Sequence, residues 1–276
     1  MRQEYRMRHV ALGCLALVTS ACATPNPAGG PTGSPSQAQR GEPAGLVPGY
    51  LSQSSLTFGR SMLPPPPSAG SAAQAADDEA YRQAVRSRGT PRWDLAARDA
   101  EWLFPGAAGA FSCAAGIRIG ETSTPRIYSL LRRTYVDAGL AAHHATATFT
   151  RSRPFLARND PICTPALAGA YQTDPSYPSG EAAIGWAWAL VLSEIFPHRA
   201  EMLARRGYQY GQSALICGVR WQSDLDAGRL VGAMVVARLH GGDEYLAHLR
   251  GAREEAAAIR PEDLTAECAA EAEALK

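Results

Sequence analysis

The sequence predicts an all-α protein, a compact helical bundle. Apolar residues recur at helical spacing in most segments after residue 77, and no run of alternating β-branched residues suggests a strand. A Pro-Ser-Gly turn at residues 178–180 opens directly onto a long apolar segment, as a helix N-terminus does. The 46% hydrophobic fraction of the 276 residues is sufficient for a sizeable core.

The N-terminal region is expected to be a secretory signal followed by an arm. Residues 1–23 combine three arginines, a short apolar core and an Ala-Cys-Ala cleavage site, which predicts export to the periplasm. Cys22 follows Thr19-Ser20-Ala21, which also resembles a lipoprotein box. The signal would then end at residue 21 and leave a lipidated Cys22 as a membrane tether. The sequence leaves both outcomes open.

Residues 24–75 are rich in Pro, Gly, Ser and Ala and show no apolar period, so an extended arm and linker is expected there. Tyr50-Leu51 and Met62-Leu63 are candidates to hold this arm against the domain surface. The helical domain is expected over residues 76–276.

Within this domain, helical periodicity predicts the order of the elements. The first helix is expected to begin at Asp77, where three acidic residues suit the positive end of the helix dipole. Further helices are expected over 93–103, 125–136, 140–148, 180–196, 199–216, 224–239, 243–259 and 262–275. The proline-containing stretch 155–178 is expected to be a loop.

Four cysteines lie in the predicted domain: Cys113, Cys163, Cys217 and Cys268. An even number in an oxidising compartment allows two disulfides with three possible connectivities. Buried free thiols are the alternative, above all for Cys217 in its apolar run. The cysteine spacing is no metal signature, and neither a metal nor a cofactor is expected. The net charge of +1 gives no reason to expect nucleic acid.

The turn at residues 178–180 combines a helix N-terminus that favours an anion with an acidic side chain that disfavours one. Ser179 can cap the helix that begins at Gly180, and the unpaired first-turn amides of such a helix suit an anion. However, Glu181 places a carboxylate in the same turn.

Three segments carry a resemblance to a known family. They are Arg151-Ser152-Arg153-Pro154-Phe155, Tyr177-Pro178-Ser179-Gly180, and the stretch from Ser213 to Arg229. Their order and spacing resemble the bacterial class A non-specific acid phosphatases, of the type 2 phosphatidic acid phosphatase and vanadium haloperoxidase superfamily. The resemblance covers most of the chain after the signal and implies the helical fold of that family.

The resemblance also implies a catalytic mechanism. The family motif is a Lys, six residues and Arg-Pro, then Pro-Ser-Gly-His, then Ser-Arg, five residues, His, three residues and Asp. The last His is the nucleophile that becomes phosphorylated, the Asp orients it, and the other His protonates the leaving group. The Lys and two Arg hold the phosphate oxygens.

In this chain the family motif is only partly kept. The matching positions are Arg153, Ser179, Gly180 and Asp224. The changed positions are Thr146 for the Lys, Glu181 for the general-acid His, Ala214 for the second Arg and Arg220 for the nucleophilic His. The site is therefore degenerate by this resemblance, although the scaffold around it is kept.

These changes alter the chemistry of the expected site. A guanidinium offers no lone pair, so Arg220 cannot carry a phosphoryl group. Asp224, four residues on, is expected to pair with Arg220. The site charge falls by roughly two relative to the family, and one like-charge contact at ~4 Å costs on the order of 4 kcal/mol. Whether His143 or His144 faces the site is left open.

Three functions are consistent with these residues. The first is an envelope-associated pseudo-phosphatase that binds an unidentified small anionic or envelope ligand. The second is a repurposed enzyme that uses the carboxylates of Glu181 and Asp224 with Arg153 and Arg220 on a non-phosphate substrate. The third is a residual phosphomonoester hydrolase.

Overall fold

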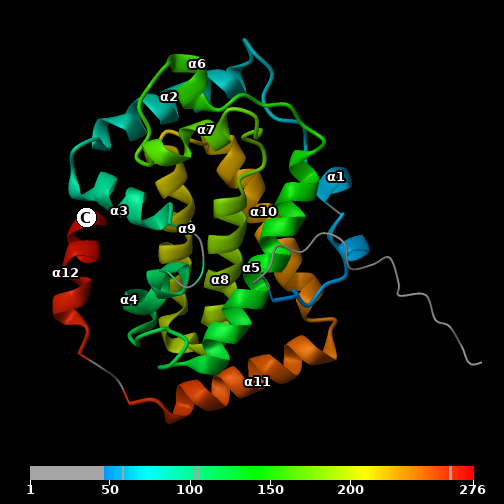
Figure 1. The fold of residues 1–276 in the computed structure, drawn as a ribbon, viewed down its shortest axis with the longest axis vertical. Coiled ribbons are helices and arrows are strands. Elements are labelled where there is room, and N and C mark those ends of the chain that lie inside the picture. Colours follow the sequence, from blue (N-terminus) through cyan, green and yellow to red (C-terminus); the bar gives the residue numbers. More distant parts are fainter. Residues whose placement is uncertain (1–46, 58, 102–103, 105, 261–262) are drawn as a thin grey trace, which may run out of the picture. The chain divides into compact units, whose positions relative to one another are not determined.

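The computed structural model describes residues 47–57, 59–101, 104, 106–260 and 263–276 (Figure 1). The predicted signal peptide at residues 1–23, Cys22 and the first part of the predicted arm lie outside these residues. Within the described residues there are helices and turns and no strand, so the all-α prediction is confirmed.

The helices follow one another along the chain with short connections. They are α1 (Gly59–Met62), α2 (Ala72–Ala84), α3 (Pro91–Asp99), α4 (Ser112–Ala115), α5 (Pro125–Thr146), α6 (Pro154–Arg158), α7 (Ala168–Tyr171), α8 (Gly180–Ile195), α9 (Ala200–Ile216), α10 (Gln222–Leu239), α11 (Asp243–Ala258) and α12 (Thr265–Ala274). Short 3₁₀ turns lie at Gln53–Leu56, Val85–Ser87, Gly106–Phe111, Pro165–Leu167 and Pro197–Arg199.

Two predictions about the middle of the domain, between residues 125 and 178, are wrong. The segments expected as separate helices over 125–136 and 140–148 form the single helix α5, because no proline interrupts it and Gly139 is tolerated inside it. The expected loop over 155–178 contains α6 and α7. Pro154 starts α6 from its first turn, where a missing N–H is not needed for helix hydrogen bonding.

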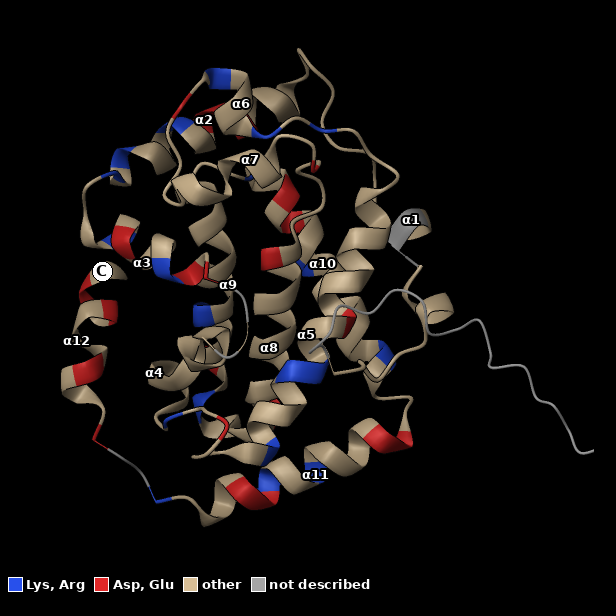
Figure 2. Cartoon of the chain, in the orientation of Figure 1, with Lys and Arg blue, Asp and Glu red and all other residues tan. Residues whose placement is uncertain are grey.

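Helix α8 lies at the centre of the bundle and packs against α5, α9 and α10 (Figure 1). Most of its residues are buried, and Figure 2 shows it free of charged residues along most of its length. A helix that is apolar all round is stable in water only when other helices surround it. Trp188 at its middle is fully buried and donates its indole N–H to the Leu131 carbonyl at 2.9 Å.

Glycines allow the neighbouring helices to approach α8 closely. A Cβ on Gly232 of α10 would lie 2.4 Å from the Ala183 carbonyl oxygen, and one on Gly228 would lie 2.3 Å from that of Ser179. On the α9 side, a Cβ on Gly207 would lie 2.4 Å from the Ala189 Cβ. The positions of α9 and α10 beside the start of α8 therefore depend on these missing side chains.

Part of the N-terminal arm is anchored on α5. The backbone N–H groups of Tyr50 and Leu51 donate to the buried carboxylate of Asp137 at 2.8 and 3.1 Å, and Arg133 stacks on the Tyr50 ring. Leu63 is buried whereas Met62 is exposed. Tyr50, Leu51 and Leu63 therefore make the expected contacts with the domain, whereas the Met62 side chain is mostly exposed. The predicted linker end at residue 75 falls inside α2. The expected helix start at Asp77 is wrong, because α2 begins at Ala72, where the Ser71 side chain caps it by accepting the Gln74 N–H.

The four cysteines form two disulfides, as the even count allowed. Cys113 pairs with Cys268 and so joins α4 to α12. Cys163 pairs with Cys217, which joins the segment after α6 to the residue that ends α9. The alternative of a free thiol at Cys217 is wrong.

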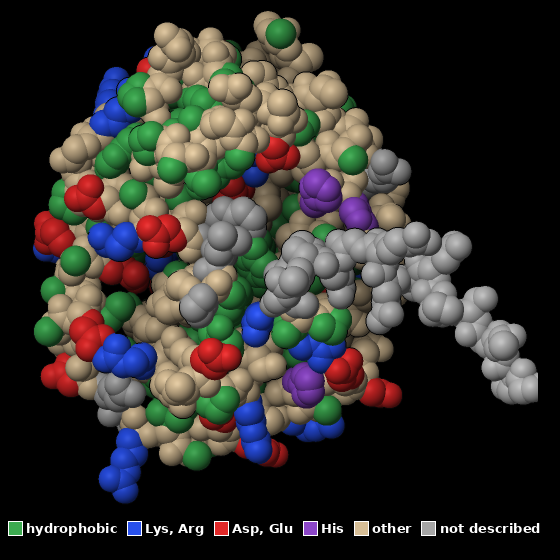
Figure 3. Space-filling view, viewed as in Figure 1, with side chains coloured by type: hydrophobic (Ala, Val, Ile, Leu, Met, Phe, Trp, Pro, Cys, Tyr) green, Lys and Arg blue, Asp and Glu red, His purple; other side chains and the backbone are tan. Residues whose placement is uncertain are grey.

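The surface carries mixed charge on the face shown in Figure 3, with acidic and basic side chains interspersed. Among the described residues, no helix has the length and apolar character needed to cross a membrane.

The close contact at Gly232 leads to a test of the packing. Gly232→Ala should lower the free energy of unfolding by about 1–3 kcal/mol, because the methyl group would meet the α8 backbone. Gly251→Ala in the middle of α11 is the matched control, since its Cβ would meet only the flexible Arg126 side chain at 3.5 Å. Urea denaturation should show the control unchanged or up to about 1 kcal/mol more stable. Equal effects of the two changes would contradict the packing argument.

Candidate functional site

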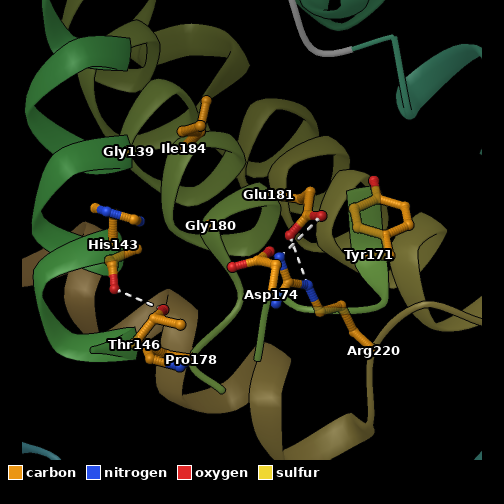
Figure 4. A pocket seen from close by; sticks show the side chains of 11 residues that line it. Gly139, His143, Thr146, Tyr171, Asp174, Pro178, Gly180, Glu181, Ile184 and Arg220 are labelled. Carbon is orange, nitrogen blue, oxygen red and sulfur yellow. Dashed lines mark hydrogen bonds and ion pairs between the residues drawn. The ribbon is translucent and has the colours of Figure 1, made fainter. Parts of the chain in front are cut away.

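A cavity of about 150 Å³ opens between α5 and the start of α8. Its lining residues are Gly139, Ala142, His143, Thr146, Tyr171, Asp174, Pro178, Gly180, Glu181, Ile184 and Arg220. Figure 4 shows His143 and Thr146 on α5 at one side, with Glu181, Arg220, Asp174 and Tyr171 opposite them. The structure thus brings several of the predicted site residues to one pocket.

Ser179 fixes the start of α8 at the edge of this pocket. Its side chain accepts the N–H of Ala182 at 3.1 Å, so it caps the helix as the sequence predicted. The same hydroxyl donates to the Glu181 carboxylate at 2.9 Å. The backbone N–H of Ser179 donates to the Asp224 carbonyl at 2.9 Å, which ties this turn to the start of α10.

Glu181 and Arg220 form a buried, two-point ion pair in the pocket wall. Arg220 Nε lies 2.9 Å from Glu181 Oε2, and Nη2 lies 3.2 Å from Oε1 (Figure 4). Arg220 Nη1 donates to the carbonyl oxygens of Pro175 and Ser176 at 3.2 and 2.7 Å. Four of the five N–H groups of Arg220 are therefore used inside the protein.

The pKa of Glu181 reflects this pairing. Burial by itself raises the pKa of this carboxyl, but the guanidinium groups of Arg220 and Arg153 outweigh burial and lower it to about 2. Glu181 is therefore a carboxylate, and not a proton donor, at neutral pH.

Arg153 is fully buried behind the pocket wall. It donates from Nε to the Asp174 carbonyl at 2.9 Å, from Nη2 to the Asp174 carboxylate at 2.5 Å and from Nη1 to the Val219 carbonyl at 3.1 Å. Its guanidinium also lies 4.1 Å from the centre of the Tyr171 ring. Burial and the nearby Arg220 lower the pKa of Arg153 to about 10, so it stays charged at neutral pH.

Asp224 does not pair with Arg220, and this prediction is wrong. Its Oδ1 lies 2.6 Å from Arg151 Nη1, and its Oδ2 accepts the N–H of Trp221 at 2.7 Å. The expected pairing assumed one continuous helix, but α10 begins at Gln222, so Arg220 precedes it. Arg151 also pairs with Asp77 at 2.6 Å. Burial raises the pKa of Asp224 to about 6, although Arg151 and the Trp221 N–H act in the opposite direction.

The two remaining predicted positions lie on different sides of Glu181. Thr146 lines the pocket, and its hydroxyl donates to the Ala142 carbonyl at 2.9 Å. Ala214 lines a smaller neighbouring cavity together with Asp99, Tyr210 and Ser213, and Glu181 borders both cavities. Of the two histidines left open by the sequence, His143 is exposed at the pocket rim.

Sequence reasoning missed three charged residues that balance the site. Asp174 faces the pocket and neutralises Arg153, while Arg151 and Asp77 hold Asp224 away from it. Arg151 lies in the first of the three family-like segments, but no local signal identified Asp77 or Asp174 as partners. The charges of Arg220, Arg153, Glu181 and Asp174 sum to zero.

Comparison with known proteins agrees with this arrangement of helices and motifs. Residues 128–244 match the model of the PAP2 superfamily. The chain is 41% identical over 212 residues to a non-specific acid phosphatase of Providencia stuartii, covering 76% of this chain and 86% of that protein. A non-specific acid phosphatase of Salmonella typhimurium is 42% identical over 197 residues, covering 70% and 78%. An acid phosphatase of Zymomonas mobilis is 34% identical over 211 residues, covering 73% and 78%. The chain therefore belongs to the non-specific acid phosphatase family within the PAP2 superfamily.

Proposed function

We propose that this chain is an exported member of the family that does not hydrolyse phosphomonoesters through a phosphohistidine and instead binds a small molecule. The observation that carries this proposal is the buried Glu181–Arg220 ion pair. By the family resemblance, these two positions belong to the general-acid histidine and the nucleophilic histidine.

Neither side chain of this pair can replace the histidine at its position. Arg220 has no lone pair with which to attack phosphorus. The pKa of Glu181 is about 2, so this carboxyl carries no proton for a leaving group at neutral pH. Both steps of a phosphohistidine mechanism therefore lack their reacting group.

Binding of a phosphate dianion is also poorly supported. Arg220 uses four N–H groups on Glu181 and on backbone carbonyls. Arg153 is not among the pocket-lining residues, and Thr146 and Ala214 supply no positive charge. A dianion would face the Glu181 and Asp174 carboxylates without a surplus of cations.

The alternative of a repurposed carboxylate enzyme loses one of its two groups in this geometry. Asp224 contacts Arg151 and the Trp221 N–H and does not line the pocket. We therefore do not propose Glu181 and Asp224 as an acid–base pair. Residual phosphatase activity is favoured only by the names of the relatives, and an assay decides between it and our proposal.

Residues 1–23 support export to the periplasm as part of this proposal. Cleavage after residue 21 would leave Cys22 available for lipid attachment, and cleavage after residue 23 would release a soluble chain. Mass spectrometry of the mature N-terminus distinguishes the two products.

The first test is hydrolysis of an aryl phosphate. The purified mature chain should show no turnover of p-nitrophenyl phosphate above buffer between pH 4 and 8, with the Providencia stuartii relative assayed in parallel. Turnover that disappears in Gly139→Leu, which fills the pocket, but persists in the exposed control Ala147→Leu would contradict the proposal.

A second test restores the family residues. The variant Thr146→Lys/Glu181→His/Ala214→Arg/Arg220→His should hydrolyse the same substrate at a rate about 10²-fold or more above the buffer background, because a proton donor and a nucleophile are supplied again. A folded quadruple variant, checked by circular dichroism and melting temperature, that neither binds vanadate nor turns over would show that the residue correspondence is wrong.

A third test concerns stability and pH. Glu181→Gln should lower the free energy of unfolding by about 3–5 kcal/mol at pH 7, because Arg220 is left buried without its counter-charge. Since the pKa of Glu181 falls from its ordinary 4.5 to about 2 on folding, the stabilisation is present above pH 4.5 and is lost as the pH falls toward 2.

Urea denaturation at several pH values measures this difference. The difference in free energy of unfolding between the native chain and Glu181→Gln should become smaller as the pH falls from 4.5 toward 2. The control Glu181→Leu/Arg220→Met removes both charges and should regain most of the lost stability. A gap that stays constant or widens as the pH falls would contradict the ion-pair account.

A further inference from the structure

The pocket has one apolar wall and one polar wall. Gly139, Ala142, Pro178 and Ile184 form the apolar part of the lining. Glu181, Arg220 and Asp174 lie opposite α5 (Figure 4). Its volume of about 150 Å³ equals that of a cavity known to hold a single six-membered ring. A ligand that fills the pocket is therefore small and has both apolar and polar faces.

The charge balance argues against a charged ligand. An anion would meet two carboxylates, while Arg220 in the pocket wall is already bonded to Glu181 and to two backbone carbonyls. A cation would meet carboxylates that are each already matched by a guanidinium, Glu181 by Arg220 and Asp174 by Arg153. Either charge would lose its hydration without gaining an unpaired counter-charge.

A wholly apolar ligand is disfavoured for a different reason. It would cover the Asp174 side chain, which is 44% exposed, and the exposed edges of Glu181 and Arg220 without replacing their water contacts. A hydroxyl group replaces both kinds of contact, because it donates to a carboxylate and accepts from a guanidinium N–H or another hydroxyl. Thr146 adds a hydroxyl oxygen on the α5 side.

We infer that the pocket binds an uncharged, polyhydroxylated molecule about the size of a six-membered ring, such as a monosaccharide or cyclitol. The C–H face of the ring would lie on Ala142 and Ile184, and its hydroxyls would contact Glu181, Arg220 and Asp174. This inference rests on the proposed loss of phosphohistidine chemistry. Of the small anionic or envelope ligand expected from the sequence, it sets aside the anionic alternative.

A matched set of probes tests whether the pocket prefers uncharged ligands to charged ones. D-glucose and myo-inositol are uncharged, whereas glucosamine, glucuronate and glucose 6-phosphate carry a positive, a negative and a doubly negative group on a similar six-membered ring. Calorimetric titration of the mature chain should show saturable binding of at least one uncharged probe, about tenfold tighter or more than the charged probes, which corresponds to ~1.4 kcal/mol. Binding of a charged probe with equal or greater affinity would overturn the inference.

Variants locate the binding. Gly139→Leu should abolish binding while the exposed control Ala147→Leu leaves it unchanged. Thr146→Val, which removes a hydroxyl at nearly constant volume, should weaken binding severalfold without unfolding the protein. Binding that survives Gly139→Leu, or no binding of either uncharged probe, would overturn the inference but leave the proposed function standing. Release of phosphate from glucose 6-phosphate, lost in Gly139→Leu, would overturn the proposed function itself.

Discussion

The ion pair between Glu181 and Arg220 determines what this site can do. Two ionised groups are stable inside a protein only when each satisfies the other and their remaining polar atoms are hydrogen bonded. Both conditions are met here, because Ser179 donates to Glu181 while the Pro175 and Ser176 carbonyls accept from Arg220. In the function that we propose, neither member of the pair takes part in phosphoryl transfer. A guanidinium has no lone pair with which to attack phosphorus, and the arginines keep the Glu181 carboxyl without a proton to give.

The bundle holds this pair in place through its helix termini. Glu181 lies in the first turn of α8, and Arg220 lies in the short connection between α9 and α10. Close contacts at Gly207, Gly228 and Gly232 set the distance of α9 and α10 from α8. Cys217, three residues before Arg220, forms a disulfide with Cys163. Arg153 donates to the carbonyl of Val219, the residue directly before Arg220. The segment that carries Arg220 is therefore fixed on several sides.

A second buried network keeps Asp224 out of the pocket. Arg151 pairs with both Asp224 and Asp77, and the Ser223 N–H donates to the Asp77 carboxylate at 2.8 Å. This network joins α2, the segment before α6 and the start of α10. Asp224 is bonded within this network and does not line the pocket, so the acidic residues that line the pocket are Glu181 and Asp174. The pocket is consequently balanced in charge, which is why we infer an uncharged ligand.

The sequence by itself determined the helical class, most of the helices after α4 and the cap at Ser179. These features depend on local periodicity and on spacing along the chain, which are visible without coordinates. It misplaced the partner of Asp224, divided α5 in two and gave no sign that Asp174 and Asp77 balance buried arginines. Only the tertiary structure decided these points, because ion pairs between residues such as Asp77 and Arg151 join helices that are distant in sequence, and their geometry follows from packing.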